Sequence, residues 1–246
     1  LPIKIHMAKK KFHEELKNIE RGKINMRFDG INNKLKISGN LFNTEYFAGL
    51  MYYVRHYYVE KPDHAKMLIP FRRSAIFTPF LHLEPYDVKA VLILDAPASK
   101  LKANGIGFGT TTINDTITYT SHLKYFSKLF GCEHTVDPTL ISWLKQGVLV
   151  LNKRPMIHED IPSFHNNIFD YVYKNVINYL FELDSDLIVA TNSRPAKDFV
   201  ESLHLKDLVE LHCDGFFPLE GMSIYDKINT QLIVHGEPTI RWSTKL

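Results

Sequence analysis

Four short, almost continuous apolar runs alternate with longer segments in which apolar residues recur at helical spacing. The runs predict β-strands at Val88–Leu94, Val148–Leu151, Leu187–Thr191 and Leu208–His212. Continuous apolar character is expected of parallel strands that are covered on both faces. The intervening segments predict helices at Ser121–Phe130, Phe164–Leu183, Pro195–Leu203 and Ile224–His235. This alternation predicts a single-domain α/β fold, with a central four-stranded parallel sheet flanked by helices.

The start of the chain has a different character. Residues Ala8–Gly22 are basic and polar with a helical spacing of apolar residues, and Ile24–Ile37 has the pattern of a small hairpin. We therefore expect residues 1–45 to form an N-terminal extension, in which Leu1–His6, ahead of Met7, derive from an expression vector. A helical pattern from Tyr46 to Tyr58 opens the main domain, which we expect to span residues 46–246.

Bulk composition narrows the class without naming a function. With 45% hydrophobic and 23% charged residues, the chain has the composition of a globular protein. A net charge of +3 permits a polyanionic partner but does not require one. The distant Cys132 and Cys213 give neither a disulfide framework nor metal spacing, which favours a reducing compartment. No apolar run is long enough to span a bilayer. We expect a cytoplasmic or nucleoid/nuclear protein, not a secreted or membrane-bound one.

Polar residues directly follow the predicted strands. Asp95, Asn152, Asn192 and His212 lie at the carboxyl ends of the four runs, where open α/β sheets bind their ligands. The turn Gly105–Gly109 is not a dinucleotide fingerprint, because it lacks the later glycine and the acidic residue. The histidines have no metal-ligand spacing with cysteines or carboxylates. The sequence therefore predicts a site at this edge of the sheet, without a cofactor and without a metal.

Several segments carry a family resemblance in their order and spacing. YFAGLMYYV is similar to a YFxxLMxFV motif, WLKQGVLVLN at Trp143–Asn152 to WxxQGVLLLN, and TIRW near the end to PIDW. The run from Asp87 to Thr110 is similar to a strand, VVILGQDPYH, that leads to GLxFS. Together, from about Tyr46 to Trp242, these segments resemble the family 1 uracil-DNA glycosylases.

The resemblance assigns roles to individual residues. It implies that Phe108 stacks on uracil and that the Asn152 amide reads the uracil edge, since an amide offers one donor and one acceptor. It implies that His212 donates to the uracil oxygen. The family's tyrosine, which excludes the thymine methyl group, is replaced by Ala98 or Pro97, so the base pocket is expected to be wider. The alternative is that each has only a structural place: Phe108 in the core, Asn152 in a turn at a strand end, and His212 at a strand end without a functional role.

The catalytic aspartate has two candidate positions. Counting forward from Val88 places it on Ala96 and aligns Pro97 with the family's proline, whereas counting back from Gly105 places it on Asp95. The forward register keeps the strand intact and is favoured, and it leaves no catalytic base. The family's histidine in this loop is also absent.

The DNA-handling loops also depart from the family pattern. Ser193 at a predicted helix start is a candidate phosphate contact, with Arg194 and Lys197 adding charge, although a serine at this position is more often only a helix cap. The family's HPSPLS loop is replaced by a shorter one, in which Phe216, Phe217 or Leu219 are candidates for the wedge that fills the vacated base stack. Packing on the core is the alternative for these three.

Two hypotheses follow, with an unrelated α/β enzyme as a third. The first is a degenerate glycosylase fold, inactive or impaired, that binds uracil-containing or single-stranded DNA, or a protein partner such as a DNA-mimic inhibitor or a replication or transcription subunit. The second is an active DNA glycosylase that uses Asp95 and His212. The altered loops favour the first.

Overall fold

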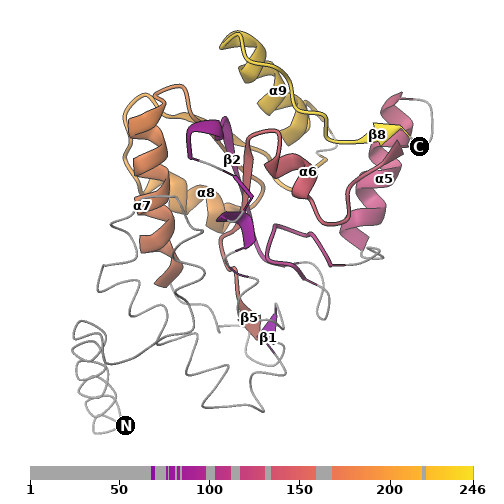
Figure 1. The fold of residues 1–246 in the computed structure, drawn as a ribbon, viewed down its shortest axis with the longest axis horizontal. Coiled ribbons are helices and arrows are strands. Elements are labelled where there is room, and N and C mark those ends of the chain that lie inside the picture. Colours follow the sequence, from indigo (N-terminus) through magenta and orange to yellow (C-terminus); the bar gives the residue numbers. More distant parts are fainter. Residues whose placement is uncertain are drawn as a thin grey trace, which may run out of the picture.

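The computed structural model describes residues 68–69, 76, 78–80, 82–83, 85–97, 103–111, 117–130, 134–158, 168–217 and 220–245. The expected extension over residues 1–45 and the helix expected from Tyr46 to Tyr58 lie outside this range, as do Ala98 and Leu219. The described residues form a layered α/β arrangement around a central sheet (Figure 1).

The central sheet has four parallel strands in the order β4-β2-β6-β7. The strands are β2 (Ala90–Leu94), β4 (Val148–Asn152), β6 (Ile188–Thr191) and β7 (Val209–His212). All four predicted strands and the predicted fold class are confirmed, with strand bounds that differ from the predicted ones by one or two residues. Two short antiparallel pairs lie outside this sheet, β1 (Leu68–Ile69) with β5 (Ile157–His158), and β3 (His134–Thr135) with β8 (Thr244–Lys245).

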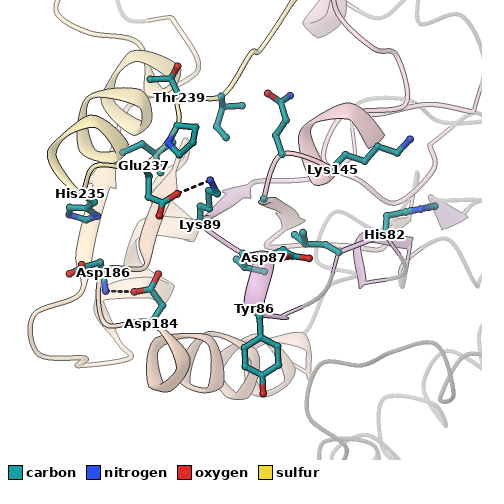
Figure 2. A pocket seen from close by; sticks show the side chains of 17 residues that line it. His82, Tyr86, Asp87, Lys89, Lys145, Asp184, Asp186, His235, Glu237 and Thr239 are labelled. Carbon is teal, nitrogen blue, oxygen red and sulfur yellow. Dashed lines mark hydrogen bonds and ion pairs between the residues drawn. The ribbon is translucent and has the colours of Figure 1, made fainter.

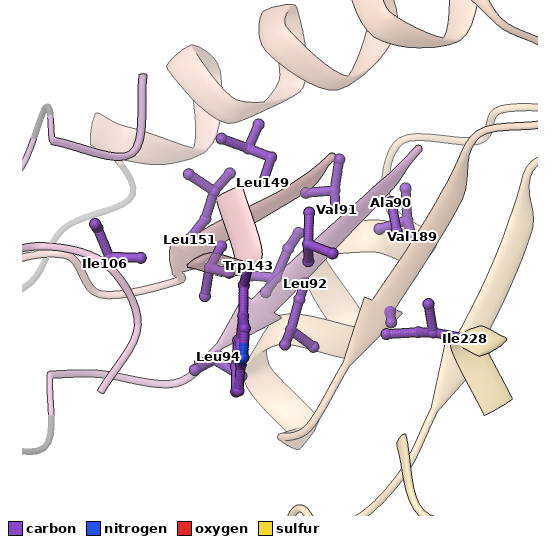
Figure 3. Packing of buried hydrophobic residues seen from close by; sticks show 14 of the residues in the cluster. Ala90, Val91, Leu92, Leu94, Ile106, Trp143, Leu149, Leu151, Val189 and Ile228 are labelled. Atoms are coloured by element: carbon purple, nitrogen blue, oxygen red, sulfur yellow. The ribbon is translucent and has the colours of Figure 1, made fainter. Parts of the chain in front are cut away.

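Burial explains why the strands have continuous apolar sequences. Every residue of β2, β4 and β6 is buried, because these strands are covered on both faces. Strand β7 is at the edge of the sheet, and there Glu210 reaches solvent. Figure 3 shows Leu149 on the side of a long helix and Leu94 on the opposite side, next to Trp143. The core therefore has two layers, one on each face of the sheet.

Helices cover both faces. They are α5 (Ile117–Phe130), α6 (Ile141–Leu144), α7 (Ile168–Leu183), α8 (Arg194–Glu201) and α9 (Ile224–Val234), with a short 3-10 helix, η4 (Pro85–Asp87). Helix α5 begins four residues before the predicted start. Its β-branched first turn is a poor helix former, but buried Tyr119 extends the apolar stripe that His122 and Phe126 continue. No helix in the described part of the chain could cross a membrane.

Side-chain contacts assign the helices to the two faces of the sheet. Helices α7 and α8 touch through Tyr173 and Phe199, and α8 packs on β6. Helices α5, α6 and α9 meet through His122, Trp143 and Tyr225. Because paired residues of adjacent parallel strands point to the same side, the strand register gives each face its residues. We call them the α8 face, with Ile93, Leu151, Thr191 and His212, and the α9 face, with Leu92, Leu94, Val150 and Asn152.

Candidate functional site

A locked turn, Asn104–Thr110, covers the carboxyl end of the α9 face. The buried Asn104 side chain accepts from the Ile106 amide at 2.9 Å and donates to the Thr139 carbonyl at 2.8 Å. Gly107 has a φ of +49°, and a Cβ there would lie 2.7 Å from Val150 Cγ1 and 2.8 Å from Leu94 Cδ1. A glycine is needed at this position because both the backbone conformation and the space exclude a side chain.

Asn152 lies beneath this turn with half of its amide unpaired. Its Nδ2 donates to the Gly107 carbonyl at 2.9 Å, and a carbonyl only accepts, so the amide orientation is fixed by this bond. The side chain is 1% exposed, and Oδ1 has no hydrogen-bond partner among the residues that the structure describes. A buried acceptor without a donor costs roughly 1–3 kcal/mol. Such an atom can receive an N–H group from a ligand.

Phe108 is enclosed in an aromatic cluster. Its ring is 2% exposed and lies 4.3 Å from the His122 ring, tilted by 33°. Trp143 and Phe216 meet it edge-on, with ring centroids 5.7 Å and 5.5 Å away. A base that stacks on Phe108 must therefore displace a neighbouring ring, and half-buried Phe216 is the more exposed of these neighbours.

His122 is a neutral imidazole at the centre of the cluster. Nδ1 lies 2.6 Å from the Thr118 carbonyl and must donate to it, so Nε2 accepts from the Tyr225 hydroxyl. Burial lowers the pKa of His122 from 6.5 to about 4, against the opposing effect of the hydrogen bond to Thr118. The ring therefore packs as an uncharged aromatic group at neutral pH.

Asp95 follows β2 and is bound by an arginine. Arg154, just beyond β4, donates from Nη2 to Oδ2 at 2.5 Å and from Nε to Oδ1 at 3.1 Å. The Asp95 side chain is 38% exposed and the Arg154 side chain is 30% exposed. Both carboxylate oxygens are thus engaged by one guanidinium group. Ala96 is half-buried and Pro97 is buried in the same loop.

His212 ends β7 on the α8 face. Its Nδ1 lies 2.9 Å from Thr191 Oγ1, and its Nε2 lies 2.9 Å from Asp214 Oδ1. Together with Lys197 and Val200 of α8, it lines a small groove of about 160 Å³. The residue thus contacts groups of the α8 face and of the loop that follows β7.

The structure therefore brings some of the predicted site residues together and separates others. Asn152 bonds the carbonyl of Gly107, the residue before Phe108, so both lie at the turn on the α9 face. His212 is on the other face, and strands β2 and β6 lie between β4 and β7. Three strand spacings amount to about 14 Å. Asp95 lies between these positions at the carboxyl edge of the sheet, paired with Arg154.

The candidate DNA contacts lie in two places, at the start of α8 and in the loop that follows β7. Ser193 caps α8 by accepting from the Ala196 amide at 3.4 Å, while Arg194 and Lys197 form ion pairs within the helix with Asp198 and Glu201. Phe216 and Phe217 are half-buried and pack against His122 and Tyr225.

A separate cavity of about 730 Å³ lies at the amino ends of the strands, away from all these residues. Lys89, Asp87, Lys145, Asp184 and Asp186 contribute to its charged lining, and Lys89 pairs with Glu237 at 2.7 Å (Figure 2). None of the site residues predicted from the sequence lines it.

Sequence reasoning missed the partners that define the site. Asn104 shapes the turn, Arg154 binds Asp95, and His122 covers Phe108. Of these, only His122 left a usable signal, because it shares the apolar stripe of α5 with Tyr119 and Phe126. The other two act through contacts that no local pattern reveals.

Comparison with known proteins identifies the class. No protein-family model matches the chain. Its sequence is 28% identical over 163 residues to the uracil-DNA glycosylase of Borreliella burgdorferi, covering 62% of this chain and 71% of that protein. It is 25% identical to the enzyme of that name from Mycoplasmopsis pulmonis over 200 residues, covering 76% and 87%. For the one from Bacillus mycoides the identity is 24% over 218 residues, covering 83% and 92%.

Solved structures agree in fold. The crystal structure of mimivirus uracil-DNA glycosylase has a TM-score of 0.63 at 15% identity, covering 85% of this chain and 88% of that one. A substituted form of that viral protein, in complex with UGI, has a TM-score of 0.65 at 17% identity, covering 82% and 86%. The class is thus an α/β protein with a fold like that of the uracil-DNA glycosylases. Among sequences, the chain is similar to bacterial proteins that carry this name.

Proposed function

We propose that this chain is a divergent relative of the family 1 uracil-DNA glycosylases that binds uracil-containing single-stranded DNA without hydrolysing it. The base is held on Phe108, with its N3–H donated to Asn152 Oδ1. Phe216 leaves the Phe108 ring when the base enters. The observation that carries the proposal is the buried Oδ1 of Asn152, an acceptor without a donor among the described residues, on a side chain that bonds the carbonyl of Gly107, the residue before Phe108.

Three features support binding without hydrolysis. Arg154 engages both oxygens of Asp95, the carboxylate that hydrolysis would need to orient water. His212 lies on the opposite face of the sheet from Asn152. Ala96, at the alternative position of the catalytic aspartate, has no ionisable group. Loss of one positioned electrostatic group typically costs about 10²–10³-fold in rate.

Two measurements on one set of oligonucleotides test the proposal. The strands carry a single central uracil, N3-methyluracil or thymine. We expect no release of uracil, and we expect binding of the N3-methyluracil strand to be about 5- to 100-fold weaker because Oδ1 loses its donor. Thymine should bind like uracil, since no tyrosine blocks its methyl group. Asn152→Ala should remove the difference between the uracil and N3-methyluracil strands.

An active glycosylase is the second candidate function, favoured by the sequence similarity to proteins named uracil-DNA glycosylase. It predicts an abasic product from the uracil strand, and loss of that product in Asp95→Asn and in His212→Ala. Product formation that depends on Asp95 would overturn the non-hydrolysing proposal. Equal binding of the uracil and N3-methyluracil strands would overturn the role of Asn152.

A further inference from the structure

Helix α5 turns basic and aromatic residues to solvent. Lys124, Lys128 and Leu129 are exposed, and half-buried Tyr125 lies between them. The helix sequence, ITYTSHLKYFSKLF, contains no acidic residue. Within the described part of the chain, neither ammonium group has a carboxylate at ion-pairing distance. Both positive charges are therefore available to an external anion.

Tyr125 forms a stacked pair with Phe217. Their ring centroids are 4.3 Å apart, with an angle of 19° between the planes. The Tyr125 hydroxyl also donates to Asp226 Oδ2 of α9 at 2.9 Å. Phe217 also meets His122 at 4.8 Å, and His122 covers Phe108. The stacked pair is thus the outer end of the aromatic cluster that begins at Phe108.

We propose that Tyr125, Phe217, Lys124 and Lys128 form a second contact surface for single-stranded nucleic acid, next to the base site. A base that neighbours the one bound by Asn152 stacks on the Tyr125–Phe217 pair, and the two lysines pair with phosphates. The inference rests on the proposed function and extends it. Stacking tolerates every base, and a groove of positive charge with aromatic platforms is typical of proteins that bind single strands. Bases within a duplex are not available for such stacking.

The salt dependence of binding tests the two lysines. Fluorescence anisotropy with a labelled single strand of about 20 nucleotides gives the affinity at several salt concentrations. The double variant Lys124→Gln/Lys128→Gln should lower the slope of log K against log salt by about 1.4, since each phosphate contact in a single strand contributes about 0.7. The matched control is Lys174→Gln/Lys206→Gln, two exposed lysines outside α5. Its slope should equal that of the unsubstituted protein.

Ring substitutions test the stacking. Tyr125→Leu and Phe217→Leu should each weaken binding about 5- to 100-fold, because one stacked base is lost, whereas Tyr125→Phe should bind like the unsubstituted protein. Thermal unfolding followed by circular dichroism checks that each variant folds. The lysine variants are expected to fold like the unsubstituted protein, because the substituted side chains are exposed.

The uracil and N3-methyluracil strands separate the two proposals. Substitutions on α5, at Lys124, Lys128 and Tyr125, should weaken binding of both strands equally and leave the preference for uracil unchanged. The second surface is wrong if the α5 variants have unchanged affinity and salt slope. If the uracil preference still requires Asn152 in that case, the base site is supported. Binding that depends on α5 without any uracil preference supports the surface and overturns the base site. If the unsubstituted protein binds no single strand, both proposals are wrong.

Discussion

Asn152 and His122 show how one buried polar side chain can suit a ligand while another suits only the fold. Within the described ranges, the amide of Asn152 has one partner, the Gly107 carbonyl, and its oxygen has none. The imidazole of His122 has a partner for each nitrogen, Thr118 and Tyr225. Buried polar groups are normally satisfied, so an unsatisfied one in a defined position indicates an interaction with something outside the chain.

Protonation of His122 should destabilise the protein in acid. Its pKa is about 4 in the folded state and 6.5 in the unfolded state, so the unfolded chain binds more protons between these values. The contribution of neutral His122 to stability is therefore fully present above about pH 6.5. It is lost as the pH falls towards 4, which lowers the free energy of unfolding by about 3 kcal/mol. Urea denaturation at several pH values measures the slope. In His122→Phe this part of the pH dependence should disappear, and an unchanged slope would contradict the assignment.

At the scale of the elements, tight turns bring the strands to their register. The Gly147 carbonyl accepts from the amides of Lys89 and Ala90, at the point where β2 and β4 begin. Gly107 allows the turn that covers Asn152 to approach β2 and β4, and Gly109 leaves room for the carbonyls of Ile106 and Thr139. These positions depend on the absence of a side chain, which the sequence shows as glycine but does not explain until the neighbours are known.

Gly147 and Gly236 offer a matched test of close approach. Both have positive φ, +94° and +75°, but a Cβ at Gly147 would lie 2.5 Å from the Asp87 carbonyl oxygen, while one at Gly236 meets nothing within 4 Å. Gly236→Ala should cost about 1–2 kcal/mol for the left-handed backbone alone. Gly147→Ala should cost at least about 2 kcal/mol more, because the backbone must shift. Chemical denaturation measures both, and equal costs would argue against the close contact.

At the scale of the whole molecule, a C-terminal segment fastens the α9 face. Trp242 meets the Trp143 ring edge-on at 5.1 Å, and its carbonyl accepts from Trp143 Nε1 at 3.1 Å. Asn229 of α9 bonds both backbone groups of Ile240. Helices α6 and α9 are thus joined through a segment that has almost no regular structure of its own.

Removal of the Trp242 ring should weaken the whole domain. Trp242→Ala should lower the free energy of unfolding by about 3–5 kcal/mol, since the side chain is almost fully buried. Trp242→Phe should cost much less, because Trp242 Nε1 is buried without a partner in the described part of the chain and its loss removes that penalty. The two unfolding curves, measured in urea, provide the comparison. A small loss in the alanine variant would show that the segment does not fasten this face.

The sheet could be predicted from the sequence, but the orientation of the side chains in the site could not. Apolar runs identified the four strands, and their ends identified the edge that carries Asp95, Asn152 and His212. The face to which each side chain points depends on a single-residue register, which an apolar run covered on both sides does not specify. The pair of His122 with Tyr225 joins positions 103 residues apart, and no local pattern encodes it.

The edge strand β7 has a consequence for protein engineering. Since neighbouring positions on a strand project to opposite sides, Cys213 follows His212 but is buried close to the Ile224 backbone of α9, on the side where Asn152 lies. An imidazole intended to reach the Asn152 side of the sheet should therefore be placed at position 213, and substitution of Arg154 would release the Asp95 carboxylate from its ion pair. A shift of one functional group by a single residue along the backbone moves it from one face of the sheet to the other, which no substitution at position 212 can do.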